Sequence, residues 1–121
     1  MMMRASALLC GIALCVVAAT ARAGFNIDGN KLQRYLAAYD RLEADQGTFN
    51  DTGDSAMAIG YIAGVSDAYQ GALFCPPPTV DIAQEIGIVG KYLREHPEER
   101  NQRAILIISK ALVSAFPCKP K

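Results

Sequence analysis

The sequence has few of the residues on which most catalytic and metal sites depend. It contains a single histidine, His96, and its 12 basic and 12 acidic side chains cancel in charge. Without an excess of positive charge, the chain lacks the electrostatic footprint of proteins that bind nucleic acid or anionic membranes. It also lacks a phosphate-binding loop and a dinucleotide fingerprint. These absences argue against a cofactor-dependent enzyme and against a nucleic-acid-binding protein.

The first 23 residues have the pattern of a secretory signal peptide. Arg4 supplies a positive start, residues 5 to 19 form an apolar core, and Ala21-Arg22-Ala23 fits the small-x-small cleavage pattern. The apolar core is shorter than the roughly 20 residues that a membrane-spanning helix needs. We therefore predict cleavage after Ala23, export to the periplasm and no membrane anchor. Residues 24 to 121 then form a single domain.

Export changes the cysteine count, because Cys10 and Cys15 lie within the predicted signal peptide. Only Cys75 and Cys118 remain, in a compartment that favours oxidation. Two thiols allow one connectivity, so we predict a Cys75–Cys118 disulfide. A domain of 98 residues has a small core, and a covalent bond across it adds stability.

Four segments have the apolar periodicity of amphipathic helices, and they predict an all-α fold: a small bundle of about four helices with one disulfide. Asp28 or Asn30 can cap the first helix, and Asp81 with Gln84 has the spacing of a capping box for the third. The polar stretch from Asp45 to Asp54 predicts an exposed loop. The predicted helices cover residues 28–42, 55–75, 81–95 and 104–116.

Two features of these helices predict close packing. Gly60 and Gly64 lie four residues apart and share one face of the second helix, which leaves a flat strip where another backbone can approach. The last helix is apolar on more than one side, so it is either central in the domain or covered by a second subunit. We predict a homodimer.

The sequence offers only weak candidates for catalytic residues. The segment around Ser66 loosely resembles a nucleophile elbow, but that device follows a strand, and here the serine falls in the middle of a predicted helix. One histidine and two disulfide-bonded cysteines offer no metal-binding set. We predict a protein that is not an enzyme, with no catalytic residues, no metal and no cofactor.

Four motifs in order resemble a known family. They are Gly60-Tyr61-Ile62-Ala63-Gly64-Val65 followed by Asp67, Phe74-Cys75-Pro76, Tyr92-Leu93-Arg94-Glu95-His96-Pro97, and Ala111-Leu112 with Ala115-Phe116-Pro117-Cys118. Over residues 57 to 118 the chain resembles the Rap/Tai family, small periplasmic immunity proteins that protect bacteria against peptidoglycan amidase effectors of type VI secretion. The resemblance implies an α-helical, often dimeric inhibitor that plugs the active-site cleft of a toxin.

An inhibitor of this kind needs a protruding element, and the chain offers two: the Gln46–Asp54 loop and the turn from His96 to Arg100. We favour the turn, because Pro97 limits the backbone freedom that binding would have to freeze. It also groups His96, Glu98, Glu99 and Arg100, which can set specificity by charge. A solvated helix junction is the alternative interpretation of the turn. A small periplasmic chaperone or adaptor without enzymatic activity is the alternative function.

Overall fold

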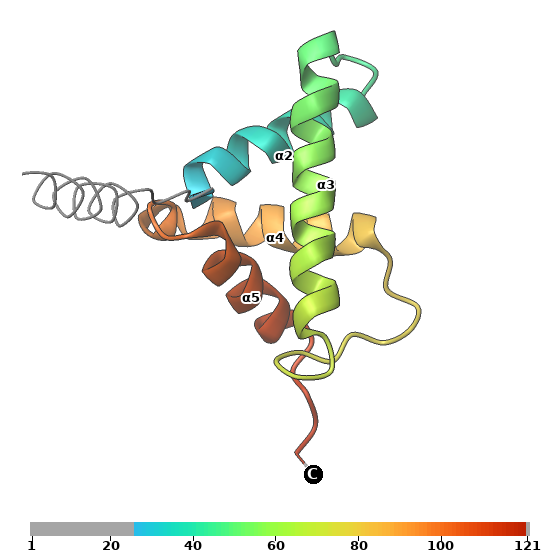
Figure 1. The fold of residues 1–121 in the computed structure, drawn as a ribbon, viewed down its shortest axis with the longest axis vertical. Coiled ribbons are helices and arrows are strands. Elements are labelled where there is room, and N and C mark those ends of the chain that lie inside the picture. Colours follow the sequence, from blue (N-terminus) through green and yellow to red (C-terminus); the bar gives the residue numbers. More distant parts are fainter. Residues whose placement is uncertain (1–25, 121) are drawn as a thin grey trace, which may run out of the picture.

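The computed structural model describes residues 26 to 120, and within them it contains four α-helices and one short 3-10 helix (Figure 1). The helices are α2 (Gly29–Glu43), α3 (Phe49–Tyr69), α4 (Ile82–Glu95) and α5 (Ala104–Ala115), with η1 (Pro97–Glu99) between the last two. The all-α prediction is confirmed. The predicted signal peptide lies outside the described residues.

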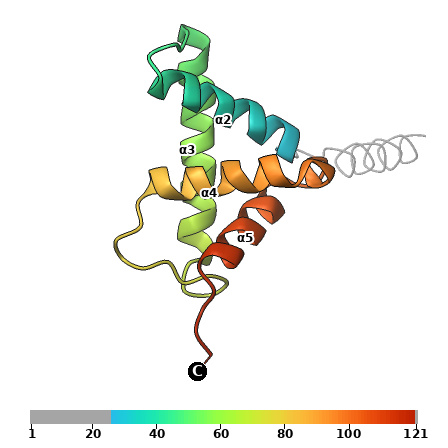
Figure 2. The same cartoon turned by 180° about the vertical axis from the view of Figure 1, so that it is seen from behind.

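The longest helix, α3, lies on one side of the bundle and the other helices lie on the opposite side. Figure 1 shows α2 and α4 crossing behind α3, and Figure 2, from behind, shows them in front of it with α5 below α4. The N-terminal end of α3 projects beyond the other helices together with the end of α2. One face of α3 is therefore left without a helix against it.

The core fills the space between α3 and the other three helices. Each helix contributes side chains that are almost fully buried, and the connection between α3 and α4 adds an aromatic ring. The largest of these are Leu32 from α2, Ile62 from α3, Phe74 from the connection, Val89 and Leu93 from α4, and Ile107, Ile108 and Leu112 from α5. Burying a side chain of this size contributes about 1.5–3 kcal/mol. The apolar periodicity of the sequence thus becomes one continuous core.

Two predicted helix starts are confirmed by hydrogen bonds. Asp28 caps α2, since its carboxylate accepts a bond of 2.8 Å from the backbone N–H of Lys31. Asp81 and Gln84 form the predicted capping box at α4, with reciprocal bonds of 2.9 Å. Each bond satisfies a backbone donor that a helix end otherwise leaves open.

The boundaries predicted for α3 are wrong at both ends. The helix begins at Phe49, not near Ser55, so most of the predicted exposed loop is helical. Thr48 is the N-cap, and its backbone N–H donates to the Asp51 carboxylate over 2.8 Å. Polar composition alone concealed this start, because capping residues and loop residues are the same types.

The helix ends at Tyr69, six residues before Cys75. Gly71 takes a positive φ of 80°, which an L side chain rarely adopts, and the chain turns there. The turn carries Phe74 into the core, where it is fully buried. The helix therefore ends at a glycine turn, before the prolines are reached.

The predicted disulfide joins Cys75 to Cys118, with 4.8 Å between the Cα atoms. The backbone N–H of Cys75 also donates to the carbonyl of Phe116 over 2.8 Å. Together they fix the α3–α4 connection to the segment that follows α5. Among the described residues, no helix is both long and apolar enough to span a membrane.

We expect Cys75→Ser to lower the free energy of unfolding by about 2–5 kcal/mol, because the unfolded chain regains the freedom of a loop of 43 positions. Urea denaturation monitored by circular dichroism measures the change. The double variant Cys75→Ser/Cys118→Ser should show a similar loss. If both variants keep the wild-type midpoint, the bridge does not stabilise the fold.

Candidate functional site

The predicted partner-binding turn connects α4 to α5 through η1. α4 ends at Glu95, and the backbone N–H of the following residue, His96, donates to the Tyr92 carbonyl over 2.9 Å. The His96 ring packs on the Tyr92 ring, with 4.2 Å between the centroids. Pro97 then starts η1, where its fixed φ suits a first helical position. The turn is an ordered corner whose first side chain rests on α4.

Glu99 is directed toward the bundle. Its Oε2 accepts hydrogen bonds of 3.0 Å from the Tyr92 hydroxyl and from Nζ of Lys110 on α5. The Lys110 bond, together with the Tyr92 bond, lowers the pKa of Glu99 against the opposing effect of burial. Burial and the neighbouring Glu99 carboxylate raise the pKa of Tyr92. Glu99 therefore stabilises the junction between α4 and α5.

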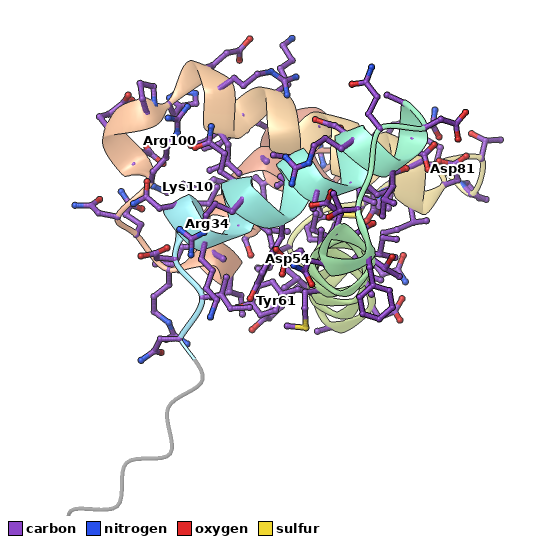
Figure 3. All side chains as sticks on the ribbon, turned by 90° about the horizontal axis from the view of Figure 1, so that it is seen from above. Arg34, Asp54, Tyr61, Asp81, Arg100 and Lys110 are labelled. Atoms are coloured by element: carbon purple, nitrogen blue, oxygen red, sulfur yellow. A yellow bond between two sulfur atoms is a disulfide. The ribbon has the colours of Figure 1, made fainter. Side chains whose placement is uncertain are left out.

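Arg100 is also engaged inside the chain. Its Nε donates to the Leu93 carbonyl over 3.0 Å, and its own carbonyl accepts from the backbone N–H of Asn30 over 2.9 Å. Arg100 thus fixes the turn to the end of α4 and to the start of α2. Figure 3 shows Arg100 and Lys110 on the same side of the bundle, far from Asp81.

Of the two remaining residues of the predicted set, Glu98 faces solvent and His96 is half-buried against Tyr92. His96 Nδ1 lies 3.2 Å from Glu98 Oε1, and the Glu98 side chain is 66% exposed. A backbone hydrogen bond and the contact with His96 lower the pKa of Glu98. The structure thus divides the predicted set: His96 and Glu98 are available to a partner, whereas Glu99 and Arg100 hold the turn in place.

The same turn contains three groups with the spacing of metal ligands. The ligand atoms of His96, Glu98 and Glu99 lie within 4.8 Å of one another. Nζ of Lys110, however, already donates to Glu99 Oε2. An ion bound here would compete with that ammonium group and with the Tyr92 hydroxyl, so we assign no metal site to the turn.

The second protruding element is the corner between α2 and α3. Asp51 is only 6% exposed, and its carboxylate accepts hydrogen bonds from the guanidinium of Arg41 and from Thr48. The Arg41 hydrogen bond is the main reason that the pKa of Asp51 lies well below its usual range. Beside this fixed corner, Phe49 is 92% exposed. The sequence interpretation missed Phe49, although the Thr48-x-x-Asp51 spacing is a recognisable start of a helix.

Gly60 and Gly64 lie on the face of α3 that no other helix covers. A Cβ atom added at either position would meet no atom within 4 Å. The glycines border a shallow groove of about 260 Å³, whose walls include Tyr61, Tyr69 and Ile105. No backbone of the described chain approaches the strip, so its contact with another helix stays a prediction that concerns a second molecule.

A comparison with protein families bears on all of these surfaces. The family of Rap1a immunity proteins matches residues 14–118, which is most of the chain. The chain belongs to the Rap1a immunity protein family. The resemblance inferred from the four sequence motifs is therefore confirmed. None of the curated proteins compared with the chain matches it.

Membership of the Rap1a family indicates an immunity protein, and immunity implies binding to an effector protein. Proteins of such a family are typically not enzymes. The hydroxyl of Ser66, the serine considered above, donates to the Glu85 carboxylate over 2.8 Å. The exposed elements of this Rap1a family member are therefore candidate surfaces for binding an effector.

We expect Asp51→Asn to destabilise the protein at neutral pH, because Arg41 and Thr48 lose a charged acceptor. The pKa of Asp51 is lower in the folded chain than the value of about 3.9 in an unfolded chain. Its contribution is therefore complete above pH 4 and is lost as the pH falls toward the folded pKa.

Thermal unfolding between pH 2 and pH 7 measures this effect. The melting temperatures of wild type and Asp51→Asn should converge as the pH decreases below about 4. Asp54→Asn, an exposed change on the same helix, is the matched control and should follow the wild type. A constant difference between wild type and Asp51→Asn at every pH would contradict the assignment.

Proposed function

We propose that this chain is a periplasmic immunity protein that binds a peptidoglycan amidase effector of type VI secretion and blocks its active-site cleft. The observation that carries the proposal is the match to Rap1a immunity proteins over residues 14–118. The signal-peptide pattern supports a periplasmic location, and the Cys75–Cys118 bond suits an oxidising compartment. A cell-wall amidase would act in that same compartment.

The turn from His96 to Arg100 has the physical properties that cleft-blocking requires. Glu99 and Arg100 fix it to three helices, so little conformational freedom is lost on binding. His96 and Glu98 project from it and can form hydrogen bonds with polar groups of a catalytic cleft. A fixed backbone with two exposed polar side chains favours specificity by charge and shape.

The α2–α3 corner is the competing contact element. Exposed aromatic side chains are enriched among the residues that contribute most to protein interfaces. Phe49 is such a side chain, and it sits on a corner that Arg41 and Asp51 hold in place. An apolar anchor here would act through burial, whereas the turn would act through charge. The two elements can therefore be separated by mutation.

We expect Glu98→Lys to weaken inhibition of the cognate amidase by about tenfold or more, since it reverses the exposed charge of the turn. Within the described residues, Glu98 makes no side-chain bond to another helix and contacts His96 of the same turn, so the variant should keep the wild-type fold. The measurement is peptidoglycan hydrolysis by the purified effector at increasing immunity protein. Glu43→Lys, an exposed charge reversal at the end of α2, is the control.

Phe49→Ala is measured in the same assay. Full inhibition by Glu98→Lys together with loss of inhibition by Phe49→Ala would assign the contact to the α2–α3 corner and contradict the turn. If no secreted amidase binds the wild-type protein, the proposed amidase partner is wrong.

We also propose that two copies associate through the uncovered face of α3. The groove beside Gly60 and Gly64 is mostly apolar, and Ile105 of α5 extends it. Leu106 on α5 and Leu73 after α3 are also half exposed. A two-fold contact between identical surfaces is the commonest way to cover such a face.

Gly64→Leu should shift the protein toward a monomer, because the side chain would fill the strip where the partner helix approaches. Sedimentation velocity at micromolar concentrations measures the mass. Gly53→Leu is the matched control, since Gly53 is also an open position in α3 but lies outside the groove. A wild-type monomer at all concentrations would overturn the dimer.

A further inference from the structure

A buried carboxyl group between α3 and α4 has no role in the surfaces described above. Glu85, in the first turn of α4, is only 6% exposed. Its Oε1 accepts the hydroxyl of Ser66 on α3 over 2.8 Å. Its Oε2 is buried and has no hydrogen-bond partner among the described residues. One half of this acidic group therefore lacks a donor.

An unpaired buried carboxylate oxygen is unusual because it is costly. Removing such a group from water destabilises the fold unless donors or an opposite charge replace the lost hydration. The N-terminus of α4 offsets part of this cost through its backbone dipole. The dipole does not supply a donor to Oε2, and an apolar residue at this position would avoid the cost entirely. A buried polar atom without a partner calls for a specific explanation, and a bound ligand is one.

Glu85 forms part of the wall of a pocket of about 200 Å³ between the end of α3 and the start of α4. The ionisable groups that line it are all acidic: Glu85, Asp67 and Asp81. Asp67 is exposed and makes no side-chain contact within the described chain, whereas Asp81 uses Oδ1 to cap α4. The pocket thus combines negative charge with unused acceptor oxygens, which suits a cationic ligand.

The spacing of the three carboxyl groups distinguishes between kinds of cation. Among the described residues, the turn residues form the set of three ligand groups with the spacing of a metal site, and Asp67, Asp81 and Glu85 do not form a second set. A guanidinium group instead carries five N–H donors in a planar fork and can bond to separated oxygens. The pocket is also smaller than the roughly 300 Å³ at which sites for small-molecule ligands begin. It has room for one side chain.

The geometry points to an arginine-binding pocket: an arginine side chain of the bound effector enters between α3 and α4 and pairs with Glu85, Asp67 and Asp81. The assignment of the arginine to an effector rests on the proposed function, whereas the chemistry of the pocket is independent of it. Because Oε2 is buried, an arginine can pair with it only after a movement of side chains at the rim of the pocket. Asp67 and Gln70 are exposed there, and their side chains form no bond that would resist it. Figure 3 shows Asp81 far from Arg100, so the pocket is separate from the turn.

The test uses acetyl-Gly-Arg-Gly-amide and its citrulline counterpart, which has the same shape without the charge. Each peptide is titrated into the ¹⁵N-labelled exported protein, and amide chemical shifts are recorded. We expect the arginine peptide to shift the amides of residues 66–70 and 81–85, and the citrulline peptide to leave them unchanged. Glu85→Gln keeps the size of the side chain and should weaken binding of the arginine peptide about tenfold.

Two further variants keep the result interpretable. Asp67→Asn removes an exposed charge that makes no contact in the fold, so it should weaken binding about threefold even if Glu85→Gln does not fold. Glu43→Gln is the same chemical change on the surface of α2 and should bind as the wild type does. Equal shifts with both peptides, or wild-type affinity in both Glu85→Gln and Asp67→Asn, would overturn the proposal.

A different measurement, binding of an effector to the chain, tests the proposed immunity function. If an effector co-purifies equally with wild type and Glu85→Gln, its arginine does not occupy the pocket and the inference is wrong, while the immunity function is retained. If the arginine peptide binds as described and no amidase binds the chain, the pocket is retained and its source of arginine is a different protein.

Discussion

The packing of three helices against a single side of α3 is the constraint on which the rest of the structure depends. The buried side chains of α2, α4 and α5 converge there with Phe74. Because all of this apolar burial is on one side, the opposite face of α3 is left to solvent with Gly60 and Gly64 on it. The same arrangement makes the end of α3 project from the bundle (Figure 1). The surfaces available for binding are consequences of this one-sided core.

Charged residues divide into those that hold the fold and those that remain available. Arg41 with Asp51, and Lys110 with Glu99, are pairs that join consecutive helices across the turn between them. Such pairs define how helices meet, and removing one partner leaves the other without compensation. Glu85 is different, because its second oxygen has no donor in the described chain. That contrast is why a binding role is assigned to this acid and structural roles are assigned to the others.

An immunity protein binds an effector protein, and this architecture suits binding. A covalent bond fixes the α3–α4 connection, and the turn between α4 and α5 is held by side chains on both helices. Exposed residues on a fixed backbone lose less entropy on binding than residues of a mobile loop. The fixed backbone is therefore part of how an immunity protein can bind an effector.

Much of the fold could be predicted from the sequence because it rests on short-range physics. Helix periodicity, the caps at Asp28 and Asp81, and the single possible pairing of Cys75 with Cys118 each depend on neighbouring residues or on a count. Four short motifs were also enough to indicate the family. The start of α3 was missed because its capping residues are the same types that form loops.

The remaining features depend on contacts between residues far apart in the chain. Gly71, with its positive φ, is a local signal for the end of α3, but the burial of Phe74 after it depends on the other helices. In the predicted turn, Glu99 points inward only because α5 brings Lys110 beside it. Ser66 and Glu85 are 19 positions apart and meet because α3 and α4 pack together. The sequence by itself determined which helices form and which cysteines pair, since those depend on local propensity and composition. Only the tertiary structure decided which polar side chains are paired and which stay open, because that follows from how the helices cross.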